Sequence, residues 1–472
     1  MKVLLVDPPR FDKESKLDLK LQHNLPKIGL LSLASVLIKN NIKTSFLDLQ
    51  QISVSSDLDD EKIVRKLNGF SPDIIAISYN VTEVINVHRF SRIIKRSLPS
   101  TKIILGGSQP SVNPREVFEI ISETDYVVYG EGEETIVELI KALENKQKLG
   151  TIKGLAFRQE NDVIVNEKRE LIKDLDKLPF PAWHLISIKR YSPSPTALYA
   201  RGLTINTCTS RGCTFDCVYC NKQVYGRKWR GKSAKNIMEE MKLLKQKYKV
   251  RNIYFFEDTF TLDKKRIHEL CKLMVKENIN IPWSCMTRTD CVDLRLLKNM
   301  KKAGCRQIAY GIESGSDRIN KLMKRNFNLK DAKEITDYTK RLGIEARGFY
   351  MIGYPTETRE EVMQTIDTAI KLDLDISFLS IIMPYPGTEL WDMVKDRINF
   401  KTWKQFDVYN PGELIYTTEN MTEKELNELY SLAYRKIYLR PKYVLKQIIS
   451  LIKNPYTIRR YRIGSFLSLI KG

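Results

Sequence analysis

The 472-residue sequence has no cysteine in its first 207 residues and none in its last 167, because all eight cysteines lie between Cys208 and Cys305. A disulfide framework would spread cysteines along the chain, so the clustering indicates metal or redox chemistry in a reducing compartment. No apolar run approaches the ~18 residues that a membrane span needs, and Pro8 comes too early for a signal peptide. We therefore expect a soluble, cytoplasmic chain.

Acidic residues are missing from the end of the chain. The last is Glu428, and ten of the 21 net positive charges lie beyond it. The patterns at 441–453 and 455–470 are amphipathic, and one face of the first carries Val444, Leu445, Ile448, Ile449 and Ile452. This combination favours peripheral contact with the inner face of a membrane; the alternative is a helical pair packed on the protein. The tail lacks the aromatic interleaving of a nucleic-acid module, so nucleic acid is not an expected partner.

The first 150 residues alternate strand-like and helix-like patterns, which predicts a doubly wound, Rossmann-like α/β domain. The expected strands are 2–7, 43–48, 73–78, 101–107 and 125–130, and the expected helices lie near 28–40, 83–97, 113–122 and 132–144. Ligands of such a sheet bind at the carboxyl ends of its strands.

A second alternating series follows a connector at 151–200 that contains a hairpin. It predicts a (β/α)6 partial TIM barrel over 201–390, with its chemistry at the strand carboxyl ends. The expected strands are 203–207, 252–257, 281–286, 306–311, 346–353 and 375–383, and the expected helices lie near 233–249, 263–277, 293–302, 330–342 and 358–371. Residues 391–472 form a basic, helical C-terminal region.

Three cysteines follow the first strand of this second series with the spacing C-x3-C-x2-C: Cys213, Cys217 and Cys220. Three thiolates can hold three irons of a [4Fe-4S] cubane and leave the fourth iron open. A structural zinc site would need four ligands, and Cys208 is the nearby candidate for the fourth. The cubane interpretation suits a loop at the mouth of a barrel better.

This motif resembles the signature of the radical S-adenosylmethionine (SAM) superfamily, over about residues 200–390. The resemblance implies that a reduced cluster cleaves SAM to a 5′-deoxyadenosyl radical. It also implies a set of SAM-binding residues at the strand ends, comprising Tyr219, Glu257, Asp258, Arg288, Glu313, Ser314, Ile352 and Gly353. No catalytic residue beyond these can be assigned.

A doubly wound domain before such a barrel is similar to the cobalamin-binding members of the superfamily. The resemblance implies a cobalamin site at the strand exits, comprising Asp7, Pro8, Pro9, Ser78, Asn80, Gly106, Gly107, Ser108, Gly130 and Glu131. Domains that ligate cobalt through histidine carry Asp-x-His-x-x-Gly after the first strand, whereas this chain reads Asp-Pro-Pro-Arg-Phe-Asp from Asp7. We therefore expect cobalamin without a histidine ligand, or a domain of this fold that binds no corrin.

The combined resemblance implies a cobalamin-dependent radical SAM methyltransferase acting on an unactivated carbon. The amphipathic tail suggests a hydrophobic, lipid-like or isoprenoid-like substrate, and cluster reduction needs an external donor such as flavodoxin or ferredoxin. The alternative is oxidative cyclisation or other non-methyl radical chemistry, with or without cobalamin. No cysteine outside 208–305 could hold a second cluster.

Overall fold

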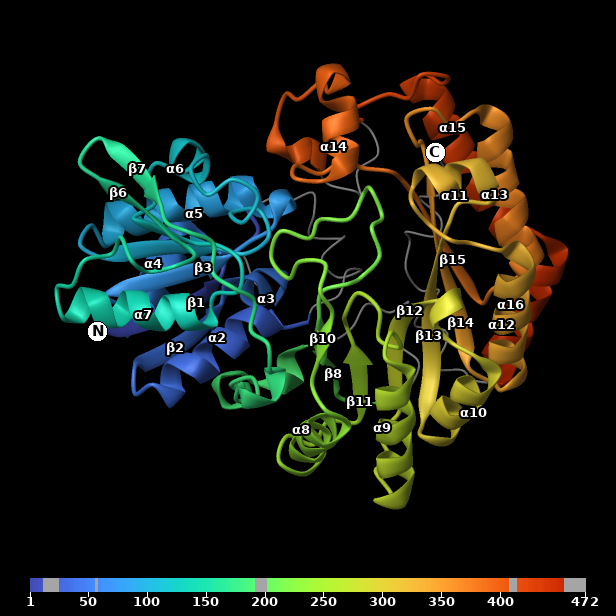
Figure 1. The fold of residues 1–472 in the computed structure, drawn as a ribbon, viewed down its shortest axis with the longest axis horizontal. Helices are drawn as coiled ribbons and strands as arrows, with labels where there is room; N and C mark the ends of the chain where they lie inside the picture. Colours follow the sequence, from blue (N-terminus) through green and yellow to red (C-terminus); the bar gives the residue numbers. More distant parts are fainter. Residues whose placement is uncertain (12–24, 56–57, 192–201, 407–413, 454–472) are drawn as a thin grey trace.

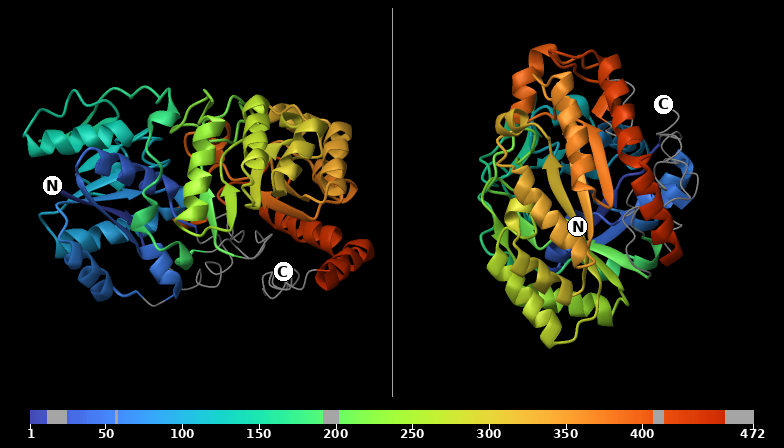
Figure 2. Two further views of the ribbon diagram at one scale, coloured as in Figure 1. Left: turned by 90° about the horizontal axis from the view of Figure 1, so that it is seen from below. Right: turned by 90° about the vertical axis from the view of Figure 1, so that its right-hand side faces the viewer.

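The computed structural model describes residues 1–11, 25–55, 58–191, 202–406 and 414–453, so the expected amphipathic pattern at 455–470 lies outside it. Two sheets, each layered with helices, lie side by side in Figure 1. The first is blue to cyan and the second green to orange. Figure 2 shows the same two bodies from below and from the side. The predicted fold class, a Rossmann-like domain before a partial barrel, is confirmed.

The first domain is built on a seven-stranded sheet with the order β2-β1-β3-β4-β5-β6-β7. Its parallel strands are β1 (Lys2–Asp7), β2 (Lys43–Asp48), β3 (Ile74–Ser78), β4 (Lys102–Gly106) and β5 (Tyr126–Val128). Alternate strand residues enter two cores: Val3 and Leu5 pack with α2 and α7, and Leu4 and Val6 pack with α4 and α5. The helices are α2 (Ile28–Lys39), α3 (Leu49–Ser55), α4 (Asp60–Phe70), α5 (Val84–Ser97), α6 (Val117–Ile120) and α7 (Glu133–Glu144).

The hairpin expected in the connector belongs to this sheet. Strands β6 (Leu155–Gln159) and β7 (Asp162–Val165) continue it in antiparallel fashion, because β6 pairs with β5. The sheet of the first domain therefore extends past residue 150 to Val165. The sequence at 151–200 predicted the hairpin itself but not the pairing of its first strand with β5.

The second domain is a six-stranded, all-parallel sheet with the order β15-β14-β13-β12-β11-β8. Its strands are β8 (Thr204–Thr207), β11 (Asn252–Phe255), β12 (Trp283–Arg288), β13 (Cys305–Glu313), β14 (Glu345–Ile352) and β15 (Ile376–Ile381). Helices α8 (Ala234–Gln246), α9 (Lys264–Lys276), α10 (Leu294–Lys302), α11 (Asp317–Leu322), α12 (Leu329–Arg341), α13 (Arg359–Leu372) and α14 (Glu389–Val394) connect and follow them. Strands β8 and β15 are the two edges, so the barrel is open.

Helix α15 (Glu423–Tyr438) completes the open edge at β15. The Tyr438 hydroxyl accepts from Ser377 N at 3.0 Å and donates to Ser377 O, while Tyr434 makes the same pair of contacts with Leu379, at 3.4 and 3.0 Å. The two rings stack with centroids 5.8 Å apart. An unpaired edge is a template for intermolecular pairing, and these tyrosines supply the donors and acceptors of a missing strand.

Replacing both edge-covering tyrosines (Tyr434→Phe with Tyr438→Phe) keeps the rings and removes the hydroxyls. We expect a loss of about 1–3 kcal/mol for each buried backbone group left unsatisfied, measured by urea unfolding, together with faster aggregation. Tyr248→Phe is the control, since this half-buried hydroxyl has no hydrogen bond among the described residues. Equal unfolding midpoints for the two variants would contradict the edge role.

Candidate active site

The three-cysteine loop is held at its two ends by a short antiparallel pair. Strand β9 (Ser210–Arg211) enters the loop and β10 (Arg230–Gly231) leaves it. Gly212 begins the turn with φ +78°, and a Cβ there would lie 2.5 Å from Lys228 O. The sequence between these anchors places all three thiols on one loop at the carboxyl end of β8.

The cysteine thiols meet different neighbours. Cys213 Sγ lies 3.8 Å from Thr259 Oγ1, and Cys217 Sγ lies 4.0 Å from Arg288 Nη1 and 3.9 Å from Arg325 Nη1. Within the described ranges, no three His, Cys, Asp or Glu side chains converge on one ion position. A cubane does not need such convergence, because each thiolate binds a different iron.

Cys208, the candidate fourth zinc ligand, lies between β8 and β9, before the loop begins. Its thiol donates to Ser210 O at 3.0 Å. Burial raises the pKa of both Cys208 and Cys220 to about 12, so the position in the chain, and not the pKa, distinguishes Cys208 from the loop thiols. The loop itself carries three thiols, which fits a cluster with one open iron.

Glu257, one of the expected SAM-binding residues, supports the start of the cysteine loop. It accepts hydrogen bonds from Thr209 N and Oγ1 at 2.9 and 2.7 Å and from Ser210 Oγ. Arg266 lies 3.8 Å away. Both carboxylate oxygens are therefore engaged in these local contacts. Asp258, the next residue, is exposed and has no hydrogen bond among the described residues.

Arg288, another of the expected SAM-binding residues, packs on the same loop. Its guanidinium lies 3.6 Å from the centroid of the Phe215 ring and is bidentate to Asp290 at 2.8 and 2.5 Å. Arg288 therefore joins β12 to the middle of the cysteine loop.

Arg325 is a site residue that sequence reasoning missed. It lies between α11 and α12, and its guanidinium donates to Gly311 O at 2.7 Å and Tyr219 Oη at 3.1 Å and lies 3.5 Å from Glu313. Glu313 adopts φ +67°, and burial raises its pKa. The only sequence signal was the polar segment 324–328, which has no apolar periodicity.

Hydrogen bonds also hold the carboxyl ends of β13 and β14, close to Arg325 and Glu313. Ser314 is buried and lies 3.2 Å from Thr365 Oγ1. At the end of β14, Ile352 is buried, and Gly353, with φ +89°, donates to Glu357 Oε2 and accepts from Tyr416 Oη at 3.1 Å. The expected SAM residues therefore lie at the carboxyl ends of β11 to β14, on the same side as the cysteine loop.

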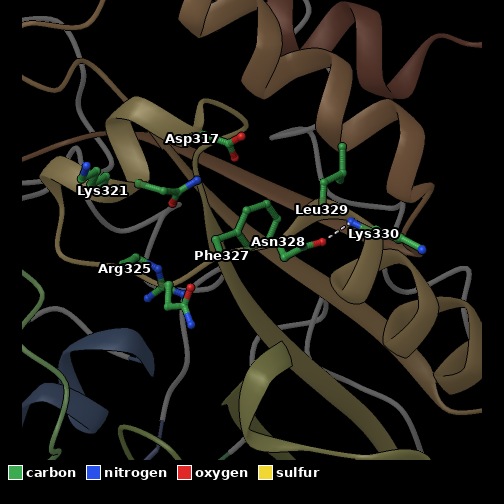
Figure 3. A pocket seen from close by; sticks show the side chains of 9 residues that line it. Asp317, Lys321, Arg325, Phe327, Asn328, Leu329 and Lys330 are labelled. Atoms are coloured by element: carbon green, nitrogen blue, oxygen red, sulfur yellow. Dashed lines mark hydrogen bonds between the residues drawn. The ribbon is translucent and has the colours of Figure 1, made fainter.

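A polar pocket of about 480 Å³ opens next to Arg325. Figure 3 shows Lys321, Arg325 and Phe327 around it, with Lys330 on its far side. Since Arg325 lines this pocket and also approaches Cys217, one side chain separates the pocket from a predicted cluster ligand.

The first domain presents glycines at its carboxyl edge. A cavity of about 100 Å³ is lined by Ser78, Gly106, Gly107, Gly130 and Glu131, and also by Arg211, Val224 and Tyr225 of the second domain. Gly107 has φ +106°, and a Cβ there would lie 2.6 Å from Tyr79 O, whereas a Cβ on Gly130 would have no atom within 4 Å. The edge is therefore free of side chains, with open space at Gly130 and close backbone packing at Gly107, and a side-chain-free edge fits the close approach of a bulky group.

Other expected cobalamin residues have structural partners. Asp7 is buried 2.8 Å from Lys27 Nζ, which also lies 2.7 Å from Glu83, and burial raises the pKa of Asp7. Asn80 caps the short helix η1 (Val81–Glu83) in a capping box with Glu83. Pro8 and Pro9 are buried and Ser108 is half-buried at the same edge.

A buried network of two arginines and two glutamates joins the domains. Arg211 Nη1 lies 2.8 Å from Glu131 Oε1 and its Nη2 pairs with Glu133, while Arg230 Nη1 lies 2.7 Å from Glu131 Oε2. Ile172 N also donates to Glu131 at 2.7 Å. Glu131 therefore has both carboxylate oxygens engaged, and this Arg–Glu network ties the entrance of the cysteine loop to the exit of β5.

Comparison with known proteins agrees with this geometry. Residues 207–369 match the radical SAM superfamily and residues 15–140 match the B12 binding domain. An uncharacterized methyltransferase of Pyrococcus horikoshii is 31% identical over 451 residues, 95% of both chains. The chain belongs to the cobalamin-binding radical SAM enzymes. It is methyltransferase-like, and SAM, a [4Fe-4S] cluster and cobalamin are its cofactors.

Two further relatives bear on this radical SAM enzyme. An anaerobic magnesium-protoporphyrin IX monomethyl ester cyclase of Cereibacter sphaeroides is 26% identical over 406 residues, 84% of this chain and 65% of the cyclase. The solved structure of the cobalamin-dependent SAM radical enzyme OxsB, with aqua-cobalamin and SAM bound, superposes with a TM-score of 0.72 at 19% identity, covering 98% of this chain and 72% of OxsB. That likeness shows the shared fold.

Glu131→Gln tests the Arg–Glu network. Removing one charge leaves two buried guanidinium groups without full compensation, and breaking a buried pair costs about 3–5 kcal/mol. We expect a large fall in the thermal unfolding midpoint of the anaerobically reconstituted enzyme. Glu134→Gln, at an exposed pair with Arg169, is the matched control and should change little. Equal midpoints would show that the network does not hold the domains together.

Glu357→Gln tests the buried carboxyl behind Gly353. Burial raises the pKa of Glu357 to about 7, so the folded state keeps a proton that the unfolded state releases. Stability therefore falls as the pH rises from about 4.5 to 7. The variant should lose this part of the pH dependence, measured by chemical unfolding from pH 5 to 8. Glu360→Gln, at an exposed position, should keep it, and an unchanged slope in Glu357→Gln would contradict the assignment.

Proposed function

We propose that this enzyme transfers a methyl group from SAM to an unactivated carbon of a hydrophobic, lipid-like or isoprenoid-like substrate. The observation that supports this best is the cavity shared by the two domains. Its walls combine the glycine edge of the first domain with Arg211, which lies two residues before Cys213. A methyl carrier and a radical source must act on one substrate, so their sites must be adjacent.

The cluster, when bound, supplies the electron that cleaves SAM, and cobalamin supplies the methyl carrier. Asp258 is available to accept from the SAM amino group, and Arg325 would bind the SAM carboxylate through its buried Nε, which has no hydrogen-bond partner among the described residues. Tyr219 and the backbone of Ile352 and Gly353 would border the adenine. Ser78, Gly106, Gly107 and Gly130 would border the cobalamin, and the Arg–Glu network would hold the two sites in register.

The external reductant, an acidic flavodoxin- or ferredoxin-like protein, would approach at the pocket next to Arg325. Lys321 and Lys330 are exposed there, Asp317 is the one acidic lining residue, and Arg325 Nη1 lies 3.9 Å from Cys217 Sγ. Exposed cations steer an acidic partner to such a site.

Oxidative cyclisation is the second candidate. It is favoured by the cyclase relative, which matches 84% of this chain. The two candidates differ in the fate of the SAM methyl group: transfer moves it to the product, whereas cyclisation leaves it on methionine. SAM carrying a deuterated methyl group therefore distinguishes them.

Anaerobic reconstitution with iron, sulfide and hydroxocobalamin tests the proposal. We expect about four irons and one cobalt per chain, with deuterated methyl appearing in a lipid extract incubated anaerobically with the enzyme, the deuterated SAM and a low-potential reductant. The triple variant Cys213→Ala, Cys217→Ala and Cys220→Ala should lose the iron and keep the cobalt, because the glycine edge lies on the other domain. Four irons without cobalt would overturn methyl transfer. Unchanged iron in the triple variant would overturn the cluster assignment.

A further inference from the structure

Helix α16 (Pro441–Lys453) turns an apolar face outward at the end of the described chain. Val444, Leu445, Ile448, Ile449 and Ile452 are 41, 58, 48, 43 and 75% exposed. Their spacing of one, three, one and three residues places them on a single helical face. Scattered exposed apolar residues are ordinary, but a contiguous stripe of this kind marks a contact surface.

The opposite face of α16 is fixed to the barrel, so the apolar stripe cannot turn inward. Tyr443 is buried and donates to Asp375 O at 2.9 Å, and Lys446 pairs with the Asp375 carboxylate at 2.9 Å. Lys442 and Arg440 lie 3.3 and 3.4 Å from Asp373. In Figures 1 and 2, α16 runs along the outside of the barrel.

The orientation of α16 is the reverse of that of a helix that packs its apolar side against the protein. The sequence pattern alone could not decide it, because an amphipathic helix buries whichever face meets its complement. Here Asp373 and Asp375, at the turn between α13 and β15, meet the basic side of the helix. The apolar side is left uncovered by any described residue.

The net positive charge of the C-terminal segment indicates that the partner of this stripe is negatively charged. No acidic residue follows Glu428, and ten Lys and Arg do. An anionic lipid surface attracts such a segment by about 1 kcal/mol per basic residue near the headgroups, and the apolar stripe can enter the boundary with the acyl chains. A second copy of the chain would bring a C-terminal segment of the same net positive charge against this one, and like charges repel.

We propose that α16 docks this enzyme on an anionic lipid surface, with the stripe Val444, Leu445, Ile448, Ile449 and Ile452 inserted in the headgroup region. Asp375 directly precedes β15, so the contact lies at the amino ends of the barrel strands, away from the cysteine loop. No described helix is long and apolar enough to cross a membrane, and interfacial docking needs none. The proposal does not depend on methyl transfer or on bound cobalamin.

Vesicle flotation of the full chain tests this. Vesicles of phosphatidylcholine with 30% phosphatidylglycerol should bind the protein, and pure phosphatidylcholine vesicles should bind it at least ~10-fold less, with binding to the anionic vesicles weakening as salt rises. The double variant Leu445→Glu with Ile449→Glu should bind anionic vesicles at least ~10-fold more weakly. The matched control, Val165→Glu with Val275→Glu, adds the same charges at exposed apolar positions elsewhere and should bind like the wild type.

Far-ultraviolet circular dichroism and light scattering on all three proteins establish that each is folded. Undiminished vesicle binding by the Leu445/Ile449 double variant would overturn the proposal. The proposal would also be overturned if the wild type did not bind anionic vesicles and formed a dimer, while the Leu445/Ile449 double variant was a monomer. The stripe would then be an interface between two copies of the chain. Vesicle binding by a chain truncated after Lys453, with no binding by the full chain, would also overturn the proposal, since residues 454–472 would then cover the stripe.

Discussion

The active site depends on the desolvated charges between the two domains. Breaking any of these buried pairs leaves an uncompensated charge out of water, so the network favours the relative placement of the domains in which all four groups are paired. Arg211 lies in β9, at the entrance of the cysteine loop, and Glu131 at the exit of β5. The same four charges therefore set the position of the cluster loop and the position of the glycine edge.

Much of the acidic and basic chemistry at the strand ends serves this positioning. Glu257 holds the first residues of the cysteine loop, Arg288 stacks on Phe215 in its middle, and Lys27 joins the loops after β1 and β3. Strand-end polar residues in this enzyme thus form two groups, those that we propose bind ligands and those that hold the strand-end loops in place. Burial with satisfied hydrogen bonds distinguishes the second group.

The architecture could be predicted from the sequence because it depends on local patterns. Every expected strand lies within two or three residues of its observed bounds, and the cysteine spacing alone defined the cluster loop. Contacts between residues that are far apart in the chain could not be predicted from the sequence. The contacts of Glu131 with Arg211, the placement of Arg325 between two helices and the outward face of α16 all depend on residues that are remote in the chain. The sequence places a motif residue such as Glu257 at the end of its strand, but it does not predict which groups Glu257 hydrogen-bonds.

The tyrosines that close the edge of the half-barrel also bear on how the chain is made. Strand β15 leaves the ribosome more than forty residues before α15, so during synthesis the backbone donors and acceptors on its outer edge, away from β14, have no partner. Nascent chains in this interval present an open strand edge to one another, which is the condition for misassembly. Slow translation through the segment that precedes Tyr438 would lengthen that exposure. The yield of folded enzyme is therefore tied to the timing of α15, and any shortened form that ends before α15 would carry the open edge permanently.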